Sequence, residues 1–279
     1  GVCEVDDADS KLTVRTRMAL SWSRMCVACA RARPRYRHVI SLGYFCSTAL
    51  ELQRYGLRDA SYPLDWNITP IQSALSMIQS GFDGFMEFDR LSQEPQRVLD
   101  TGSGIYLYND FDTSRPMLQQ YEAVRAKYAR RIERFRHATR QPTLFVRYIN
   151  SEVHPPGHVD SLMAPNLEEF TYLNEHMVDV LAILRQANPR NDLLLVGNTG
   201  LPKVCGGLPV YTVTPDDYDW VARKFLQKNP ELSRKLMCLS YPVSLRAWNL
   251  LRYWWPLPRL RRRLALRTRL RRIRDRAFV

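Results

Sequence analysis

The chain has 279 residues, of which 45% are hydrophobic and 25% are charged, the composition of a folded globular protein and not of a disordered one. Its 41 basic and 28 acidic side chains give a formal net charge of +13. The sequence contains no run of about 18 or more uncharged apolar residues, which is the length that a membrane span needs.

Most of the positive charge lies in a C-terminal tail, residues 246–279. This tail contains twelve Arg and one Asp, whereas the rest of the chain is nearly neutral. Trp and Leu residues alternate with the Arg residues, as in segments that lie on an anionic membrane surface. Binding to RNA or DNA phosphate and a simple solvated extension are the alternatives. We expect the tail to hold the protein at a membrane or a partner, and we regard nucleic-acid binding as unlikely.

The cysteines indicate a reducing compartment. Six Cys occur without the regular spacing of a disulfide framework, so we expect a cytoplasmic protein, held at the inner face of the membrane if the tail binds there. Cys26 and Cys29 form one CxxC, but no second pair at zinc spacing accompanies it. We interpret both as small residues of an N-terminal extension, residues 1–35.

The first half of the body alternates between predicted strands and helices. Residues 38–42 have a strand pattern, and residues 47–55 and 69–79 have helix patterns with recognisable starts or stops. Residues 104–108 are a second strand candidate. Apolar residues then recur every three or four positions, which predicts a long helix that opens near residue 116: Tyr121, Val124, Tyr128, Ile132 and Phe135.

The second half continues the alternation. Residues 143–149 are the strongest central strand candidate. Asn166 and Glu169 have the spacing of a capping box at the start of a helix. The buried stripe expected for that helix is Phe170, Leu173, Met177, Val180, Leu181 and Leu184. The remaining predicted elements are the strands 193–196 and 210–213 and the helix 220–227.

Strands separated by helices favour an α/β fold. We predict a three-layer sandwich with a mostly parallel sheet over residues 36–240, because the strand segments are joined through helices and not through hairpin turns. A basic amphipathic tail, residues 241–279, follows this domain. Neither a glycine-rich dinucleotide fingerprint nor a P-loop is present, so no cofactor is expected.

Cys46 is the main candidate for chemistry. It lies in the turn between the first predicted strand and the first predicted helix, at the sheet edge where sites gather in parallel α/β folds. The helix dipole and the backbone N–H groups of the first turn would favour a thiolate there and could stabilise an oxyanion. The alternative is a small buried core residue, which is common for a free Cys.

A thiol nucleophile needs a general base, and His154 is the preferred candidate. His154 and His158 lie in the loop that follows the strand 143–149, at the same predicted sheet edge as Cys46. The alternative is a polar loop stiffened by prolines. His38, His137 and His176 are predicted to lie elsewhere. The Pro-Pro-Gly between His154 and His158 excludes the helix that would pair them as metal ligands, so we expect no metal site.

Asp65, Trp66 and Arg147 complete the set that the pattern suggests. Asp65 could orient the base or hold a substrate hydroxyl; equally, it could cap the helix near Thr69 while Trp66 packs in the core. Arg147 lies in an apolar strand and needs an acidic partner or an anionic ligand, and we favour a structural ion pair.

Three motifs resemble a bacterial family described as papain-like cysteine peptidases. They are Ser41-Leu-Gly-Tyr-Phe-Cys46, Leu52-Gln-Arg-Tyr-Gly-Leu-Arg58 and Ser61-Tyr-Pro-Leu-Asp-Trp66, in which Leu64 replaces the usual Phe. Similarity continues in Tyr108-Asn-Asp-Phe111, Tyr128-Ala-Arg-Arg-Ile-Glu-Arg134 and Leu144-Phe-Val-Arg147, over roughly residues 38–220. Asn109 stands where family members often have His.

The resemblance implies that Cys46 is a thiol nucleophile. We group the other prominent motif residues as candidates for substrate binding: Tyr44, Trp66, Asn109, Asp110 and Arg147. The leading hypothesis is therefore a cysteine-dependent hydrolase that acts through a thioester on Cys46, with His154 and Asp65 as its catalytic partners. The alternatives are an acyltransferase that modifies a bacterial surface polysaccharide, and an inactive binding domain docked to a membrane by its tail.

Overall fold

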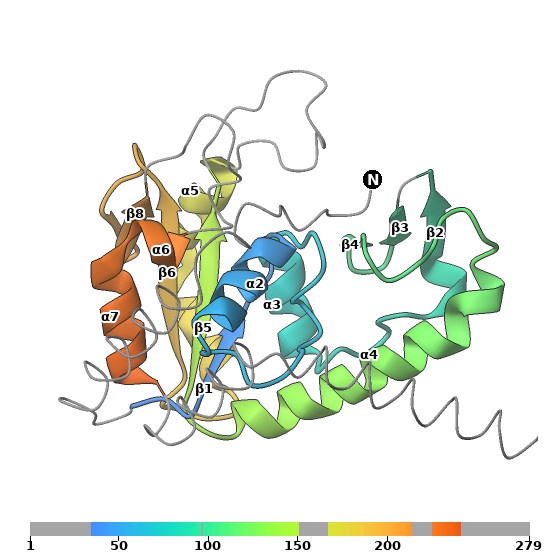
Figure 1. The fold of residues 1–279 in the computed structure, drawn as a ribbon, viewed down its shortest axis with the longest axis horizontal. Coiled ribbons are helices and arrows are strands. Elements are labelled where there is room, and N and C mark those ends of the chain that lie inside the picture. Colours follow the sequence, from blue (N-terminus) through green and yellow to red (C-terminus); the bar gives the residue numbers. More distant parts are fainter. Residues whose placement is uncertain (1–34, 96, 151–166, 214–224, 241–279) are drawn as a thin grey trace, which may run out of the picture.

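A computed structural model describes residues 35–95, 97–150, 167–213 and 225–240. A five-stranded sheet in the order β1-β5-β6-β8-β7 forms its centre (Figure 1). Strands β1, β5, β6 and β8 pair in parallel, and only β7 is antiparallel. The predicted α/β fold with a mostly parallel sheet is thus confirmed. The strands are β1 (His38–Ser41), β5 (Thr143–Ile149), β6 (Asp192–Asn198), β7 (Val204–Cys205) and β8 (Leu208–Val213).

Helices cover both faces of this sheet and make the three layers. Successive side chains of a strand point to opposite faces. In β5, Phe145 and Ile149 therefore pack in one cluster with α3, α4 and α5, whereas Val146 and Tyr148 pack in the other cluster with α2, α6 and α7. The helices are α2 (Cys46–Arg54), α3 (Ile71–Gln79), α4 (Leu118–Thr139), α5 (Leu167–Arg185), α6 (Phe225–Lys228) and α7 (Pro230–Leu239).

The amphipathic patterns of the two long helices are confirmed by burial. In α4, the predicted stripe is buried at Tyr121, Val124, Tyr128 and Phe135, and Ile132 is partly buried. The α5 stripe is buried at four of its positions, Leu173, Met177, Val180 and Leu184. Both helices therefore pack against the sheet through the faces that their 3.6-residue period predicts.

The prediction for residues 104–108 was right about the strand and wrong about the sheet. This strand, β4 (Ile105–Leu107), belongs to a separate antiparallel sheet with β2 (Leu91–Glu94) and β3 (Arg97–Asp100). The turn before β4 is closed by Asp100, whose Oδ1 accepts hydrogen bonds from the backbone N–H groups of Gly102 and Ser103. We missed β2 and β3 because they are short and largely polar, so neither has a clear hydrophobic alternation.

Helix α7 was also not predicted, although its start has clear signals. Asn229 is the N-cap, and its Oδ1 accepts a hydrogen bond of 3.0 Å from the backbone N–H of Leu232. Pro230 occupies the first helical position, where its missing N–H has no cost. Of the helix predicted over 220–227, only the part in α6 lies within the described residues.

Arg147 has the acidic partner that its apolar strand required. Its guanidinium donates two hydrogen bonds of 2.6 Å to the two carboxylate oxygens of Glu169, the third residue of α5. Both side chains are fully buried, at 0% and 1% exposure. A third guanidinium N–H donates to the backbone O of Leu42, at 2.9 Å. One buried cation therefore joins β5, α5 and the segment that follows β1.

A second polar network lies at the amino end of β1. The Nδ1 of His38 is 2.8 Å from an oxygen of Asp59, and the Tyr62 hydroxyl donates to the other oxygen, also at 2.8 Å. Burial by itself would raise the pKa of Asp59, but the hydrogen bond and charge of His38 and the Tyr62 hydroxyl hold this pKa below its ordinary value. The network ties the start of β1 to the loop that follows α2.

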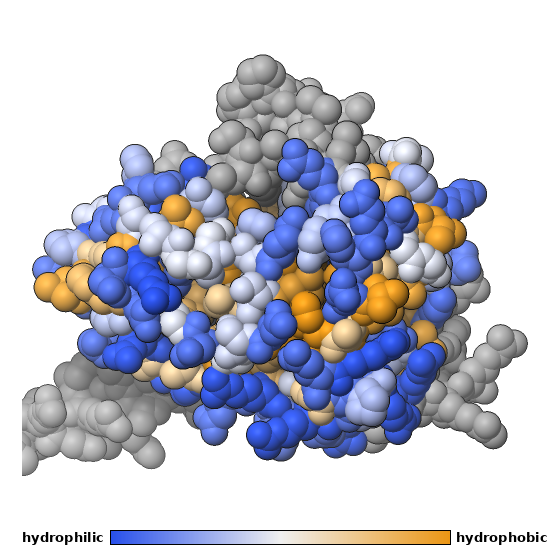
Figure 2. Space-filling model, turned by 180° about the vertical axis from the view of Figure 1, so that it is seen from behind, coloured by the Kyte–Doolittle hydropathy of each residue, from blue (hydrophilic) through white to orange (hydrophobic). Residues whose placement is uncertain are grey.

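Several predicted features fall outside the described residues: the N-terminal extension, His154, His158 and the basic tail. Within the described ranges, none of the helices is long and apolar enough to cross a membrane. The view from behind shows hydrophobic groups in the middle of the face, bordered by hydrophilic ones (Figure 2).

Removal of the Glu169 carboxylate should strongly destabilise the fold. In Glu169→Ala the Arg147 charge stays buried without its partner, so we expect a loss of about 3–5 kcal/mol in the free energy of unfolding, measured by urea denaturation. The double variant Arg147→Met/Glu169→Leu removes both charges and should recover most of this loss. A loss below about 1 kcal/mol in Glu169→Ala would show that the pair does not hold the sheet and α5 together.

Replacement of Asp59 should alter the acid dependence of stability. Because the pKa of Asp59 is lower in the folded than in the unfolded state, its contribution is complete above the unfolded value of about 3.8 and is lost as the pH falls through the folded value. We expect Asp59→Asn to be less stable near neutral pH by about 1–3 kcal/mol, and this difference should shrink below about pH 4. Urea denaturation at several pH values measures it, with the exposed Asp83→Asn as the control. A difference that does not depend on pH would contradict the assignment.

Candidate active site

The residues before Cys46 make a sharp turn from strand to helix. Strand β1 ends at Ser41, and Cys46 is already the first residue of α2. Between them Gly43 and Tyr44 both have left-handed backbone conformations, with φ of 81° and 68°. For Tyr44 this conformation is strained, because non-glycine residues rarely adopt it. The chain thus reverses its direction within four residues and places Cys46 at the carboxyl edge of the sheet.

Gly43 is required at this turn for a second reason. A Cβ at this position would lie 3.0 Å from the Cβ of Thr69 and 3.3 Å from the backbone O of Leu64. The backbone of the turn therefore packs directly against the segment before α3. Thr69 and Tyr44 also form an antiparallel bridge, in which the N–H of Thr69 donates to the O of Tyr44.

Cys46 itself is buried, with 4% of its surface exposed, and it occupies the positive end of the α2 dipole. The N-cap residue Phe45 supplies no side-chain hydrogen bond to the first turn, and this turn contains no acidic residue. The N-terminus of a helix is a position at which a thiolate is generally favoured. The arrangement resembles the strained strand–turn–helix that presents the nucleophile in many hydrolases.

Arg147 contacts the turn that precedes Cys46 and holds it in place. Its hydrogen bond to the O of Leu42 is made one residue before Gly43, and its guanidinium carbon lies 5.8 Å from the centre of the Tyr44 ring. Arg147 was a candidate for substrate binding, but its Glu169 pair and its complete burial give it a structural role in the described residues. It positions the turn that carries Cys46.

Three further residues at the same edge were missed in the sequence. The Tyr148 hydroxyl donates a hydrogen bond of 3.2 Å to the Oδ1 of Asn198, which ends β6, and its ring stacks on that of Tyr44 at 6.2 Å. Asn150 directly follows β5 and is 4% exposed. An Asn at the end of a buried strand was the signal that could have revealed this polar edge, since such ends meet at one side of a parallel sheet.

Three buried hydroxyl groups surround the turn without a hydrogen-bond partner among the described residues. They belong to Ser47 and Thr48 in the first turn of α2 and to Thr69, which packs against Gly43. Buried hydroxyls normally find partners, because an unpaired one costs free energy. These groups give the surroundings of Cys46 hydrogen-bonding capacity that the fold itself does not use.

Asp65 lies in a different network from the one expected. Its Oδ2 accepts two hydrogen bonds from Arg58, at 2.9 and 2.7 Å, and one of 2.7 Å from the backbone N–H of Tyr62. Helix α3 begins after Pro70 without a side-chain cap, so the interpretation of Asp65 as its cap is wrong. Burial raises the pKa of Asp65, whereas Arg58 and the N–H of Tyr62 counteract this rise.

Trp66 packs against the core, as the alternative interpretation predicted. It is partly buried, lies against the hydrophobic cluster that contains Cys46, and carries the Arg58 guanidinium 5.0 Å above its ring. Tyr44 belongs to the same cluster. Tyr44 is therefore a member of the hydrophobic cluster that contains Cys46, and Trp66 packs against that cluster.

Asn109 and Asp110 lie in the turn after β4, where their side chains have different surroundings. Asn109 is exposed in the turn after β4. The Asp110 carboxylate contacts the side chains of α4: the Tyr128 hydroxyl, the Lys127 ammonium at 2.5 Å and the Arg131 guanidinium at 3.4 Å. Asp110 thus anchors α4 to this turn.

Three of the five histidines lie in the described residues. His38 is held by Asp59 at the amino end of β1, opposite to the edge of Cys46, while His137 and His176 are exposed on α4 and α5. These positions agree with the expectation that none of the three lies beside Cys46. His154 follows β5, the strand next to β1, but is outside the described residues. No group of three or more His, Cys, Asp or Glu side chains suited to a metal ion occurs in the part of the chain that the structure describes.

Cys205 offers an internal contrast to Cys46. It is fully buried in β7, and its thiol donates to the backbone O of Phe170 at 3.6 Å. Burial, followed by the negative charge of Glu169, raises the pKa of the Cys205 thiol to about 11. Cys205 therefore lies in the core, in surroundings that disfavour its thiolate.

Comparisons with known proteins agree with this geometry. An uncharacterized protein of Acanthamoeba polyphaga mimivirus is 34% identical over 124 residues, which cover 34% of this chain and 53% of that protein. The chain thus spans about half the length of this curated relative. No solved structure matches the chain. Residues 37–168, which include β1, Cys46 and β5, match the family described as "Putative papain-like cysteine peptidase (DUF1796)".

Proposed function

We propose that this protein is a cysteine-dependent acyl hydrolase whose nucleophile is the thiol of Cys46. The observation that carries the proposal is the position of Cys46: the first residue of α2, separated only by the extended Phe45 from two left-handed residues, at the carboxyl edge of a parallel sheet. This position combines a helix terminus that favours a thiolate with a strained turn, a feature that clusters at functional sites. The match of residues 37–168 to the peptidase family supports the same chemistry.

The reaction would proceed through a thioester. The Cys46 sulfur attacks the carbonyl carbon of the substrate, and a general base takes the thiol proton and passes it to the leaving group. The backbone N–H groups at the start of α2 would stabilise the oxyanion. Water then attacks the thioester, which releases the acid and returns a proton to the sulfur.

We propose His154 as the base because it follows β5 in the sequence, and the carboxyl end of β5 adjoins that of β1. Asp65 would act as a positioning residue, since its contacts with Arg58 and Tyr62 hold the loop that carries Trp66. Tyr44 and Trp66 would line the substrate side of the thiol. Binding of the tail, residues 246–279, to an anionic membrane remains a separate prediction from the sequence.

Alkylation of Cys46 tests the activated thiol. With iodoacetamide and peptide-resolved mass spectrometry from about pH 5 to pH 9, we expect Cys46 to titrate below the ordinary thiol value of about 8.5. Cys205 should stay unlabelled over this range, because its pKa is raised to about 11. Cys46→Ser should abolish the release of 4-nitrophenol from 4-nitrophenyl acetate, whereas Cys205→Ser should retain it.

Titration of Cys46 at or above about pH 8.5, or full ester cleavage by Cys46→Ser, would contradict the proposal. A glycan acceptor added to the same assay separates hydrolysis from acyl transfer. Transfer would appear as an acetylated glycan, and hydrolysis as free acetate in its presence.

Substitution of Gly43 tests whether the turn sets the reactivity of Cys46. Gly43→Ala forces a Cβ against Thr69 and Leu64, so the turn must shift, and we expect the alkylation rate of Cys46 to fall by about tenfold or more. Gly207→Ala is the matched control, because Gly207 has nearly the same φ, 82°, but no atom within 4 Å of its added Cβ. Both variants carry similar backbone strain, and only the first should change the reaction of Cys46. Equal alkylation rates in the two variants would show that the conformation of the turn does not set the reactivity of Cys46.

A further inference from the structure

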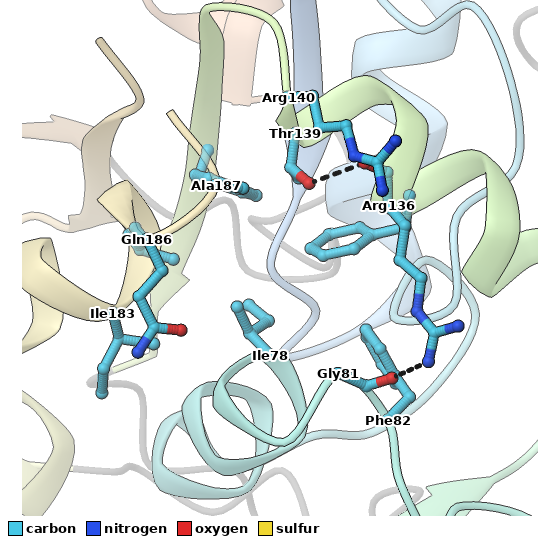
Figure 3. Close-up of a pocket in the computed structure, with 12 residues that line it drawn as sticks. Ile78, Gly81, Phe82, Arg136, Thr139, Arg140, Ile183, Gln186 and Ala187 are labelled. Carbon is cyan, nitrogen blue, oxygen red and sulfur yellow. Dashed lines mark hydrogen bonds between the residues drawn. The ribbon is translucent and has the colours of Figure 1, made fainter. Parts of the chain in front are cut away.

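A pocket of about 250 Å³ lies at the edge of the sheet opposite to Cys46, between the C-terminal ends of α3, α4 and α5 (Figure 3). Helix α4 leads into the start of β5, and α5 leads into the start of β6, so the pocket is at the amino edge. The seven residues of β5 span roughly 20 Å between the two edges. The pocket is therefore a separate feature from the candidate active site.

The floor of the pocket is aromatic and apolar. Phe82 and Phe135 meet edge to face with ring centres 5.3 Å apart, and Phe145 lies behind Phe135 at 6.0 Å. All three rings are buried in the core, whereas Ile78 and Ile183 line the pocket and are only partly buried. A ligand with an apolar tail would find a preformed hydrophobic surface here.

The rim of the pocket is cationic. Arg136 and Arg140 are among the twelve lining residues, and none of the twelve is Asp or Glu. Arg136 donates one hydrogen bond to the O of Gly81, which leaves most of its five N–H donors for other partners. The Arg140 side chain is exposed and forms no ion pair or hydrogen bond with the described residues.

The α4 dipole alone does not account for this arrangement. A helix C-terminus favours basic residues, which explains why Arg136 and Arg140 occur in the last turns of α4. It does not explain why the pocket beside these two arginines is also lined by three phenylalanines.

We propose that this pocket binds a small carboxylate with an apolar tail, of the kind of a medium-chain fatty acid. The tail would lie over Phe82 and Phe135, and the carboxylate would accept charge-assisted hydrogen bonds from Arg136 and Arg140. The volume is below the range of about 300–1,000 Å³ that is typical of drug-sized ligands, so the pocket suits a single short chain. This inference does not depend on the chemistry of Cys46.

Calorimetry with the full chain tests the proposal, with octanoate as the probe. Octanoate should bind at one saturable site. Octanol, which lacks the carboxylate, and acetate, which lacks the apolar tail, should each bind at least about tenfold more weakly. Arg140→Gln should weaken octanoate binding by about tenfold or more. Arg130→Gln, on the exposed face of the same helix and outside the pocket, should leave it unchanged.

A pocket-filling variant separates this site from the basic tail, which could also attract an anion. Ala187 is exposed and lines the pocket, so Ala187→Phe should block it without disturbing the core. We expect this variant to unfold at the wild-type temperature and to lose octanoate binding. Equal affinity for octanol and octanoate, unchanged binding by Ala187→Phe, or no binding by the wild type would each overturn the proposal. The alkylation rate of Cys46 should not respond to octanoate.

Discussion

The buried ion pair between Arg147 and Glu169 is the interaction on which the rest of the structure depends. One guanidinium holds the first turn of α5 through two hydrogen bonds and the O of Leu42 through a third. It thereby joins the central strand, the helix on one face of the sheet, and the strand end that leads to Cys46. A buried charge tolerates little displacement of its partners, because each lost contact leaves it desolvated. The hydrogen bond from Arg147 to the O of Leu42 consequently restricts the movement of the turn before Cys46.

This rigidity explains how the strained turn persists. Tyr44 adopts a left-handed conformation that costs about 1–3 kcal/mol, and Gly43 packs its backbone against Thr69. The hydrogen bond from Arg147 below and the bridge to Thr69 beside it hold this conformation. Cys46 and Cys205 are both buried free cysteines, and they occupy different positions in the fold. Cys205 is embedded in the core with a raised pKa, whereas Cys46 is presented at a helix terminus on the sheet edge.

Much of this could be predicted from local patterns. The strand 143–149 and the stripes of α4 and α5 depend on apolar periodicity, which burial against one sheet requires directly. The strands β2 and β3 could not be predicted in this way, because their residues are polar and their pairing depends on turn geometry. Asp65 was ambiguous for a related reason. A carboxylate near a helix start can cap it or bind an arginine, and only the position of Arg58 decides.

The sequence by itself determined the alternation of strands and helices in the central sheet domain, the nearly neutral body with its basic tail, and the place of Cys46 between a strand and a helix. These are properties of neighbouring residues, and helical period, glycine and charge report them directly. Only the tertiary structure decided that Arg147 pairs with Glu169, that Asp59 contacts His38, and that α3, α4 and α5 enclose a pocket with two arginines. Each of these contacts joins residues far apart in the chain, and their distances are set by how the helices pack on the sheet.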